Sequence, residues 1–100
     1  MIEVRKTRLY DKWVAGLNDI NAVARIGVRI RRLSLGNPGD VRPVGEGVSE
    51  LRIDYGPGYR VYFIHRGQTI VVLLCGGDKR TQDGDIVRAK TLAKEWTDGA

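Results

Sequence analysis

The chain is 100 residues long, with 42% hydrophobic and 29% charged residues, a composition that predicts one globular domain spanning residues 1–100. Its net charge of +5 rests mainly on arginine and favours an anionic partner such as nucleic acid, a membrane surface or an acidic protein. Cys75, the single cysteine, excludes an intramolecular disulfide and a cysteine-cluster metal site.

The chain shows no targeting or membrane-spanning pattern. Four of the first eight residues are charged, where a secretory signal needs an apolar core. The apolar run at 69–75 is too short to span a bilayer. We therefore expect a cytoplasmic protein without membrane contact, in which Cys75 is a buried structural thiol.

A short strand and two helices are predicted in the first third of the chain. Alternation at 2–5 predicts the strand, and Tyr10, Trp13, Val14 and Leu17 then fall at the i, i+3, i+4 and i+7 spacing of an amphipathic helix. Asn18 and Asp19 provide a cap for a second helix. Its apolar face consists of Val23, Ile26, Ile30 and Leu33, and the glycines and proline at 36–39 end it.

The second predicted helix also carries a basic stripe. Arg25, Arg29 and Arg32 lie at i, i+4 and i+7, with Arg31 beside them. Such a stripe either binds an anion on a partner protein or nucleic acid, or forms a solvated outer face. The sequence favours neither alternative.

Four strands and a final helix are predicted in the rest of the chain. Segment 40–47, with Pro43, is expected to form an edge strand, and turns at 56–58 and 66–68 separate three strands within 50–75. Residues 76–80 read as a flexible, cationic exit from the sheet. The final helix carries Ile86, Ala89, Ala93 and Trp96 on one face, and we expect it to fray at 98–100. The fold class is α+β, in the order β-α-α-β-β-β-β-α, with a mostly antiparallel sheet.

Cations on the predicted strands suggest a site for a phosphodiester. Arg52, Arg60, Lys79 and Arg80 would converge if their strands are neighbours, and they could stabilise a pentacoordinate transition state. Cleavage of RNA without a metal also needs a general base and a general acid. The candidates are Glu50, which shares the polar face of Arg52, and Lys79, if neighbouring cations lower its pKa.

Tyr62 and His65 lie on the same predicted strand as Arg60. Tyr62 shares the face of Arg60 and could stack on a base. His65 alternates with Val61 and Phe63, so we expect it to face the core as a structural residue rather than act in catalysis.

Three segments resemble the RelE/ParE superfamily of type II toxin–antitoxin toxins, and most closely its HigB-like, or addiction module killer protein, branch. They are ELRI at 50–53, GPGYRVYF at 56–63 and LCGGDKR at 74–80. The resemblance implies a RelE-like fold, with a curved sheet packed by two N-terminal helices and a C-terminal helix. It also implies a ribosome-dependent mRNA endonuclease that uses no metal or other cofactor and inhibits translation. Arg52, Arg60 and Arg80, with Lys79 before it, match basic residues of the family's site.

The resemblance also implies partners and a mutational result. The partners are a cognate antitoxin, a helix-turn-helix protein from an adjacent gene, together with the ribosome and mRNA; operator DNA would be bound only through the antitoxin complex. Arg60→Ala is expected to abolish growth arrest without unfolding the domain, because a surface phosphate contact contributes little to stability.

The chain departs from RelE-type enzymes at two positions. Glu50 stands where they carry a second strand cation, and no tyrosine occurs near Ile86, where they carry one. Two alternatives therefore stay open. The chain could inhibit DNA gyrase, as the ParE branch does, or it could be a non-catalytic component that acts only in antitoxin-dependent autoregulation.

Overall fold

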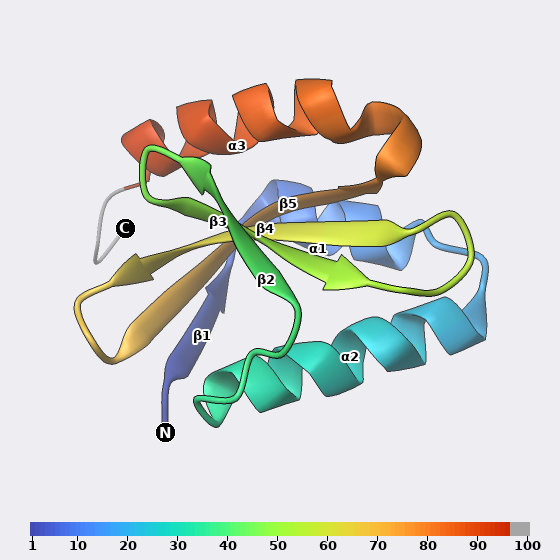
Figure 1. Ribbon diagram of the computed structural model, residues 1–100, viewed down its shortest axis with the longest axis horizontal. Helices are drawn as coiled ribbons and strands as arrows, with labels where there is room; N and C mark the ends of the chain where they lie inside the picture. The colour runs from blue at the N-terminus through green and yellow to red at the C-terminus, as the bar shows by residue number, and fades with distance from the viewer. Residues whose placement is uncertain (97–100) are drawn as a thin grey trace.

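The fold is a five-stranded mixed sheet with three α-helices (Figure 1), seen in a computed structural model that describes residues 1–96. The elements are β1 (Glu3–Lys6), α1 (Arg8–Ala15), α2 (Ile20–Ser34), β2 (Val41–Gly45), β3 (Val48–Ile53), β4 (Tyr59–Arg66), β5 (Ile70–Asp78), a 3-10 helix (Lys79–Thr81) and α3 (Gln82–Glu95). The predicted order of strands and α-helices is confirmed. The fraying expected at 98–100 lies outside the described residues.

The sheet has the strand order β1-β5-β4-β3-β2. Strands β2 to β5 pair antiparallel, and β1 pairs parallel to β5. Strand β5 lies between β1 and β4, a normal place for a strand that is apolar on both faces and covered on both sides. As predicted, β2 is an edge strand, and its register shifts between Pro43 and Gly45, where a proline is tolerated.

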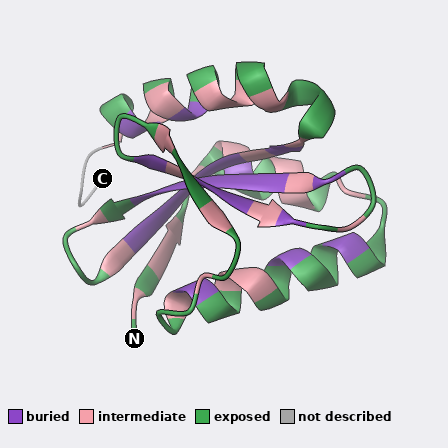
Figure 2. Ribbon diagram, viewed as in Figure 1, coloured by how far each residue is buried: buried purple, intermediate pink, exposed green. Residues whose placement is uncertain are grey.

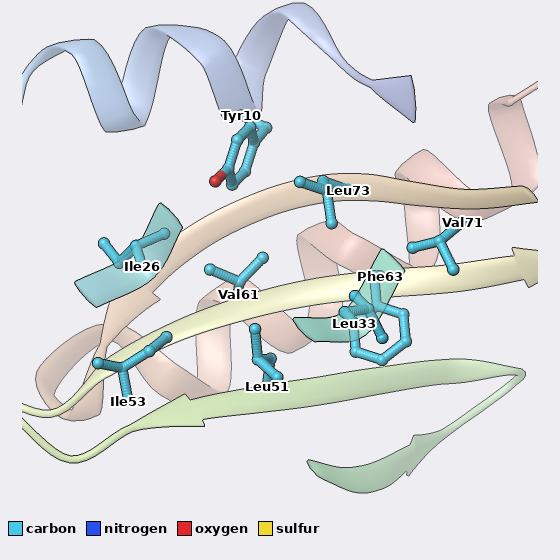
Figure 3. Packing of buried hydrophobic residues seen from close by; sticks show 9 residues of the cluster. All are labelled: Tyr10, Ile26, Leu33, Leu51, Ile53, Val61, Phe63, Val71 and Leu73. Carbon is cyan, nitrogen blue, oxygen red and sulfur yellow. The ribbon is translucent and has the colours of Figure 1, made fainter. Parts of the chain in front are cut away.

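Two apolar clusters hold helices to the two faces of the sheet. On one face Leu51, Val61 and Phe63 pack with Tyr10 of α1 and Ile26 of α2 (Figure 3). The other face is covered by α3, whose cluster comprises Val48, Tyr62, Ile64, Val72, Leu74, Cys75, Ala89 and Ala93. Figure 2 shows that the buried residues follow the central strands and the inward sides of the helices. Consecutive residues of β4 enter opposite clusters because side chains alternate along a strand.

Side-chain caps fix where the first two helices begin. The carboxylate of Asp19 accepts hydrogen bonds from the backbone N–H groups of Asn21 (2.9 Å) and Ala22 (3.2 Å), which confirms the predicted cap of α2. Thr7 caps α1 in the same way through the N–H of Tyr10 (3.0 Å). Each cap stabilises its helix by about 1 kcal/mol. None of the helices within residues 1–96 has the length and apolarity needed to cross a membrane.

The expectation of a flexible exit at 76–80 was wrong. Strand β5 continues to Asp78, whose side chain accepts from the N–H of Arg80 (2.8 Å) and caps the 3-10 helix. Gly76 lies where a Cβ would collide with the ring of Trp13, and Gly77 where it would collide with the Asp85 carboxylate. The two glycines therefore permit close packing on both faces of β5 rather than flexibility.

His65 was expected to face the core, but its side chain is exposed. Its ring does contact that of Phe63, with centroids 5.7 Å apart, so the alternation that placed it on this face was right. The residue lies near the end of β4, where its side chain faces solvent.

Candidate anion-binding site

Arg52 and Arg60 are direct partners across the antiparallel pair β3–β4. Glu50 and Arg52 alternate with the core residues Leu51 and Ile53, and so their side chains lie on the face of the sheet that α3 partly covers. The turn between the two strands contains Gly56 and Gly58, both with positive φ. Glycine tolerates this conformation, which lets β4 fold back tightly on β3.

The carboxylate of Glu50 is fully buried at the centre of this site. Its Oε1 atom accepts from Nε of Arg52 (2.7 Å) and lies 3.8 Å from Nε of Arg60. Its Oε2 atom accepts from the Tyr62 hydroxyl (3.0 Å) and from Nε2 of Gln82 (2.8 Å). One buried carboxylate thus connects β3, β4 and the start of α3.

The hydrogen bonds keep Glu50 ionised. Burial acts to raise its pKa, but the bonds from Arg52, Gln82 and Tyr62 together outweigh burial, and the pKa lies below its usual value. Burial and the Glu50 charge raise the pKa of Tyr62, so this tyrosine stays protonated and donates to Glu50. A buried, ionised carboxylate with these partners orients cations; it is not an accessible proton acceptor. Glu50 was predicted as a candidate general base, and its surroundings suit a positioning role instead.

The two strand arginines differ in exposure. The Arg52 side chain is 29% exposed and that of Arg60 only 7%. Arg60 donates from Nη1 to the carbonyls of Gly58 (3.3 Å) and Tyr59 (3.2 Å), while its buried Nε has no hydrogen-bond partner among the described residues. The expectation that Arg60 is a surface residue was wrong, and its removal would disturb the buried network. Arg52 is the strand arginine that an incoming anion can reach.

Lys79 and Arg80 lie at the same end of the sheet. Arg60 is paired with Gly77 of β5, two residues before Lys79, and the Lys79 stem lies against Gly58, 3.0 Å from where a Cβ would be. The Arg80 side chain is 81% exposed and pairs with Asp78 (3.0 Å). Its hydrogen bond to Asp78 raises the pKa of Arg80 and lowers that of Asp78. The structure thus brings the four predicted cations to one end of the sheet.

Tyr62 cannot stack on a base in this arrangement. Its side chain is fully buried in the cluster beneath α3, and its hydroxyl is bonded to Glu50. His65 is five residues from Arg60 along β4, a span of roughly 17 Å, so it lies outside the site. Burial raises the pKa of the Cys75 thiol to about 12, as fits the structural role expected for it.

Sequence reasoning did not find Gln82. This residue begins α3 and is not among the predicted site residues. Its contact with Glu50 joins residues 32 positions apart, and no local signal indicates it.

The basic stripe of α2 is divided between two roles. Arg29 donates to the backbone carbonyls of Arg52 (2.5 Å) and Pro38 (3.0 Å) and thereby holds the chain before β2 against β3. Arg25 lies over the Tyr55 ring, 4.6 Å from its centroid. Arg25 and Arg32, with Arg29, line an open groove of about 680 Å³ beside the end of β3. Only part of the stripe is therefore available to an external anion.

Two comparisons with known proteins bear on this chain. The family model described as phage derived protein Gp49-like (DUF891) matches residues 12–96. An uncharacterized protein of Haemophilus influenzae is 50% identical over 94 residues, which cover 94% of this chain and 95% of the relative. The matched region includes the Glu50 network and all four cations of the site.

Proposed function

The chain belongs to the phage-derived Gp49-like family, and we propose that it is the toxin of a type II toxin–antitoxin system with a RelE-like fold, acting as a ribosome-dependent mRNA endonuclease. The resemblance of segments 50–53, 56–63 and 74–80 to RelE- and HigB-like toxins supports this proposal. So does the cluster of cations at one end of the sheet. The protein would act in the cytoplasm, and a cognate antitoxin would neutralise it.

The observation that carries the proposal is an accessible arginine fixed by a buried carboxylate. Glu50 accepts from Nε of Arg52, which leaves the terminal nitrogens of this guanidinium to bind a phosphate. Because the partner carboxylate is buried and ionised, the arginine is oriented before RNA arrives. Pre-oriented charge stabilises a transition state without reorganisation, and removing one such donor typically costs about 100-fold to 1,000-fold in rate.

The remaining residues take roles that follow from their positions. Arg60 supports the network from within the sheet, and Arg80 is an exposed phosphate ligand beside it. Lys79 is exposed at the same end and is the candidate proton donor to the departing 5′-oxygen. Glu50 positions the arginines and does not contact RNA.

Expression of the chain in a bacterial host tests the class of activity. We expect growth arrest, with new 5′ ends inside translated mRNAs, and rescue when the helix-turn-helix protein of an adjacent gene is expressed as well. Loss of DNA supercoiling with intact mRNA would identify a gyrase inhibitor and contradict the proposal. Unimpaired growth at full expression would instead favour a non-catalytic regulatory component.

Arg52→Gln separates phosphate binding from folding. Glutamine keeps an amide that can donate to Glu50 but removes the charge, so we expect at least about 100-fold slower mRNA cleavage with the fold retained. The matched control is Arg88→Gln, on the exposed side of α3, which should arrest growth like the unchanged chain. Circular dichroism of both variants checks the fold.

A further inference from the structure

The four cations of the candidate site can hold phosphates, but none of these residues offers an aromatic face to a base. Tyr62 is buried, and no tyrosine occurs near Ile86. Proteins that bind single-stranded RNA normally stack its unpaired bases on aromatic side chains. A half-exposed aromatic ring beside the cations would complete the site.

Five of the seven aromatic side chains cannot offer a free face near these cations. Three are buried, namely Tyr10, Tyr62 and Phe63. The Tyr55 ring lies between the core and Arg25, whose guanidinium carbon is 4.6 Å from the ring centroid. Trp96 follows the last turn of α3, whereas the cations lie beside its first turn. The two rings that remain are those of Trp13 and Tyr59, and both residues are half-buried.

Tyr59 lies at the end of the sheet that carries the cations (Figure 1). It begins β4 and pairs with Asp78 near the end of β5, two residues before Arg80. Asp78 in turn accepts a hydrogen bond from Nη2 of Arg80 (3.0 Å). The pKa of Arg80 is raised first by Asp78 and also by Tyr59, as is expected for neighbouring side chains. A phosphate on Arg80 would therefore bring the attached nucleoside within reach of the Tyr59 ring.

Trp13 supports the Tyr59 ring from the side of α1. The two rings meet edge to face, with centroids 6.3 Å apart and 65° between their planes. The indole itself is seated on the backbone of Gly76, where an added Cβ would lie 2.3 Å from its ring carbons. Tyr10 contacts the indole as well, at a centroid distance of 5.9 Å. A ring that is oriented in this way before binding loses little freedom when a base stacks on it.

The polar atoms of both rings are open to a ligand. Neither the Tyr59 hydroxyl nor the indole nitrogen of Trp13 has a hydrogen-bond partner among residues 1–96. Within that range Nε of Arg60 is the one buried side-chain polar atom without a partner, so these two atoms reach solvent. Each can therefore bond to the edge of a base or to its sugar, as tyrosine and tryptophan commonly do at interfaces.

We propose that Tyr59, supported by Trp13, is a stacking site for an unpaired base of single-stranded RNA whose adjacent phosphate is bound by Arg80. That the ligand is RNA rests on the proposed function. Tyr59 alternates with Arg60 along β4, so the ring belongs to the face of the sheet that α1 covers, opposite the side chains of Arg52 and Glu50. The RNA strand would cross the end of the sheet, from the strand arginines on one face to the ring on the other.

The two indole N–H signals of the isotopically labelled full chain test this site, because Trp13 and Trp96 are its only tryptophans. The probe is a trinucleotide of adenosine with 2′-O-methyl sugars, which has no 2′-hydroxyl to attack its phosphates. The comparison is the same backbone without bases. We expect the complete trinucleotide to shift the Trp13 signal and not that of Trp96, and the abasic backbone to bind at least about tenfold more weakly. Equal binding of the two would overturn the proposal.

Tyr59→Leu supplies the matching variant, because leucine keeps the apolar contact with the core but has no aromatic face. It should bind the trinucleotide at least about tenfold more weakly, and Tyr59→Phe, which keeps the ring, should bind clearly more tightly than Tyr59→Leu. The control is Tyr55→Leu, which should bind like the unchanged chain. Circular dichroism checks the fold of each variant. Folded Tyr59→Leu that binds as tightly as the unchanged chain would contradict the stacking role.

Failure of this inference can be told from failure of the proposed function. If the unchanged chain cleaves mRNA on ribosomes but binds the complete and abasic trinucleotides equally, the stacking site alone is overturned. If it binds the complete trinucleotide through Trp13 and Tyr59 but leaves mRNA intact, the stacking site is supported and the nuclease activity is overturned.

Discussion

Glu50→Gln is expected to lower the free energy of unfolding by about 3–5 kcal/mol at neutral pH. The substitution keeps the shape of the side chain but removes a fully buried negative charge. Arg60, only 7% exposed, would then be a buried cation without a carboxylate partner. The one oxygen that remains could accept either from Arg52 or from Tyr62 and Gln82, and the new amide N–H group would face the other donors. Urea unfolding at pH 7 measures the loss.

The control for this substitution is Glu3→Gln. Glu3 also pairs with an arginine, Arg5, but its side chain is 58% exposed. Exposed ion pairs contribute about 0–1 kcal/mol, so this variant should unfold almost like the unchanged chain. A Glu50→Gln variant that loses no more stability than Glu3→Gln would show that the buried network does not hold the site together.

The loss of stability expected for Glu50→Gln depends on pH in a defined direction. The pKa of Glu50 is lowered in the folded chain from its ordinary value of 4.5. A lowered pKa means that the carboxylate stabilises the fold above pH 4.5 and that this contribution disappears as pH falls through the folded pKa. The difference in stability between the unchanged chain and Glu50→Gln should therefore narrow on acidification below pH 4.5. A difference that stays constant would contradict the assigned ionisation.

Gly77→Ala is expected to destabilise the fold by about 3 kcal/mol, the upper part of the usual range for overpacking. The new methyl group would overlap the Asp85 carboxylate, which also accepts from the Thr81 hydroxyl at 2.5 Å. Relief requires the Asp85 carboxylate to rotate out of its hydrogen bond with Thr81, or the start of α3 to move, which would draw Gln82 away from Glu50. For a domain of this size we expect the Tm to fall by more than about 10 °C.

Gly84→Ala is the matched control for Gly77→Ala. Both add one methyl group near the start of α3, but the Cβ at Gly84 meets no described atom within 4 Å. Its Tm should stay within a few degrees of the unchanged chain, since the substitution only removes a helical glycine. Equal melting of the two variants would show that the contact between β5 and α3 is not tightly packed.

Hydrophobic periodicity was sufficient to predict the elements and much of their arrangement. The spacing of Tyr10 and Val14, the Asp19 cap and the alternation in β4 are local features, and each appears in the structure where the sequence placed it. Pro43 is also a local feature, and it indicated the edge strand that the structure shows. Each of these sequence signals involves only residues that are close together in the chain, within one or two turns of a helix or within a single strand.

The interior of the candidate site could not be predicted in this way. Arg60 was expected on the surface because arginine normally is, and its burial depends on Glu50, ten residues away, and on cover by α3. Gly76 and Gly77 suggested flexibility, but the need for glycine arises from Trp13 on one face of β5 and Asp85 on the other. Contacts between distant segments decided these features, and composition does not reveal them.

Cleavage of mRNA by the purified chain on programmed ribosomes tests the central claim, that an arginine cluster organised by Glu50 cleaves RNA. We expect the unchanged chain and Arg88→Gln to cut the message at the same rate. Arg52→Gln, folded and bound to the ribosome, should cut at least about 100-fold more slowly. Cleavage by folded Arg52→Gln at the rate of the unchanged chain would contradict the account.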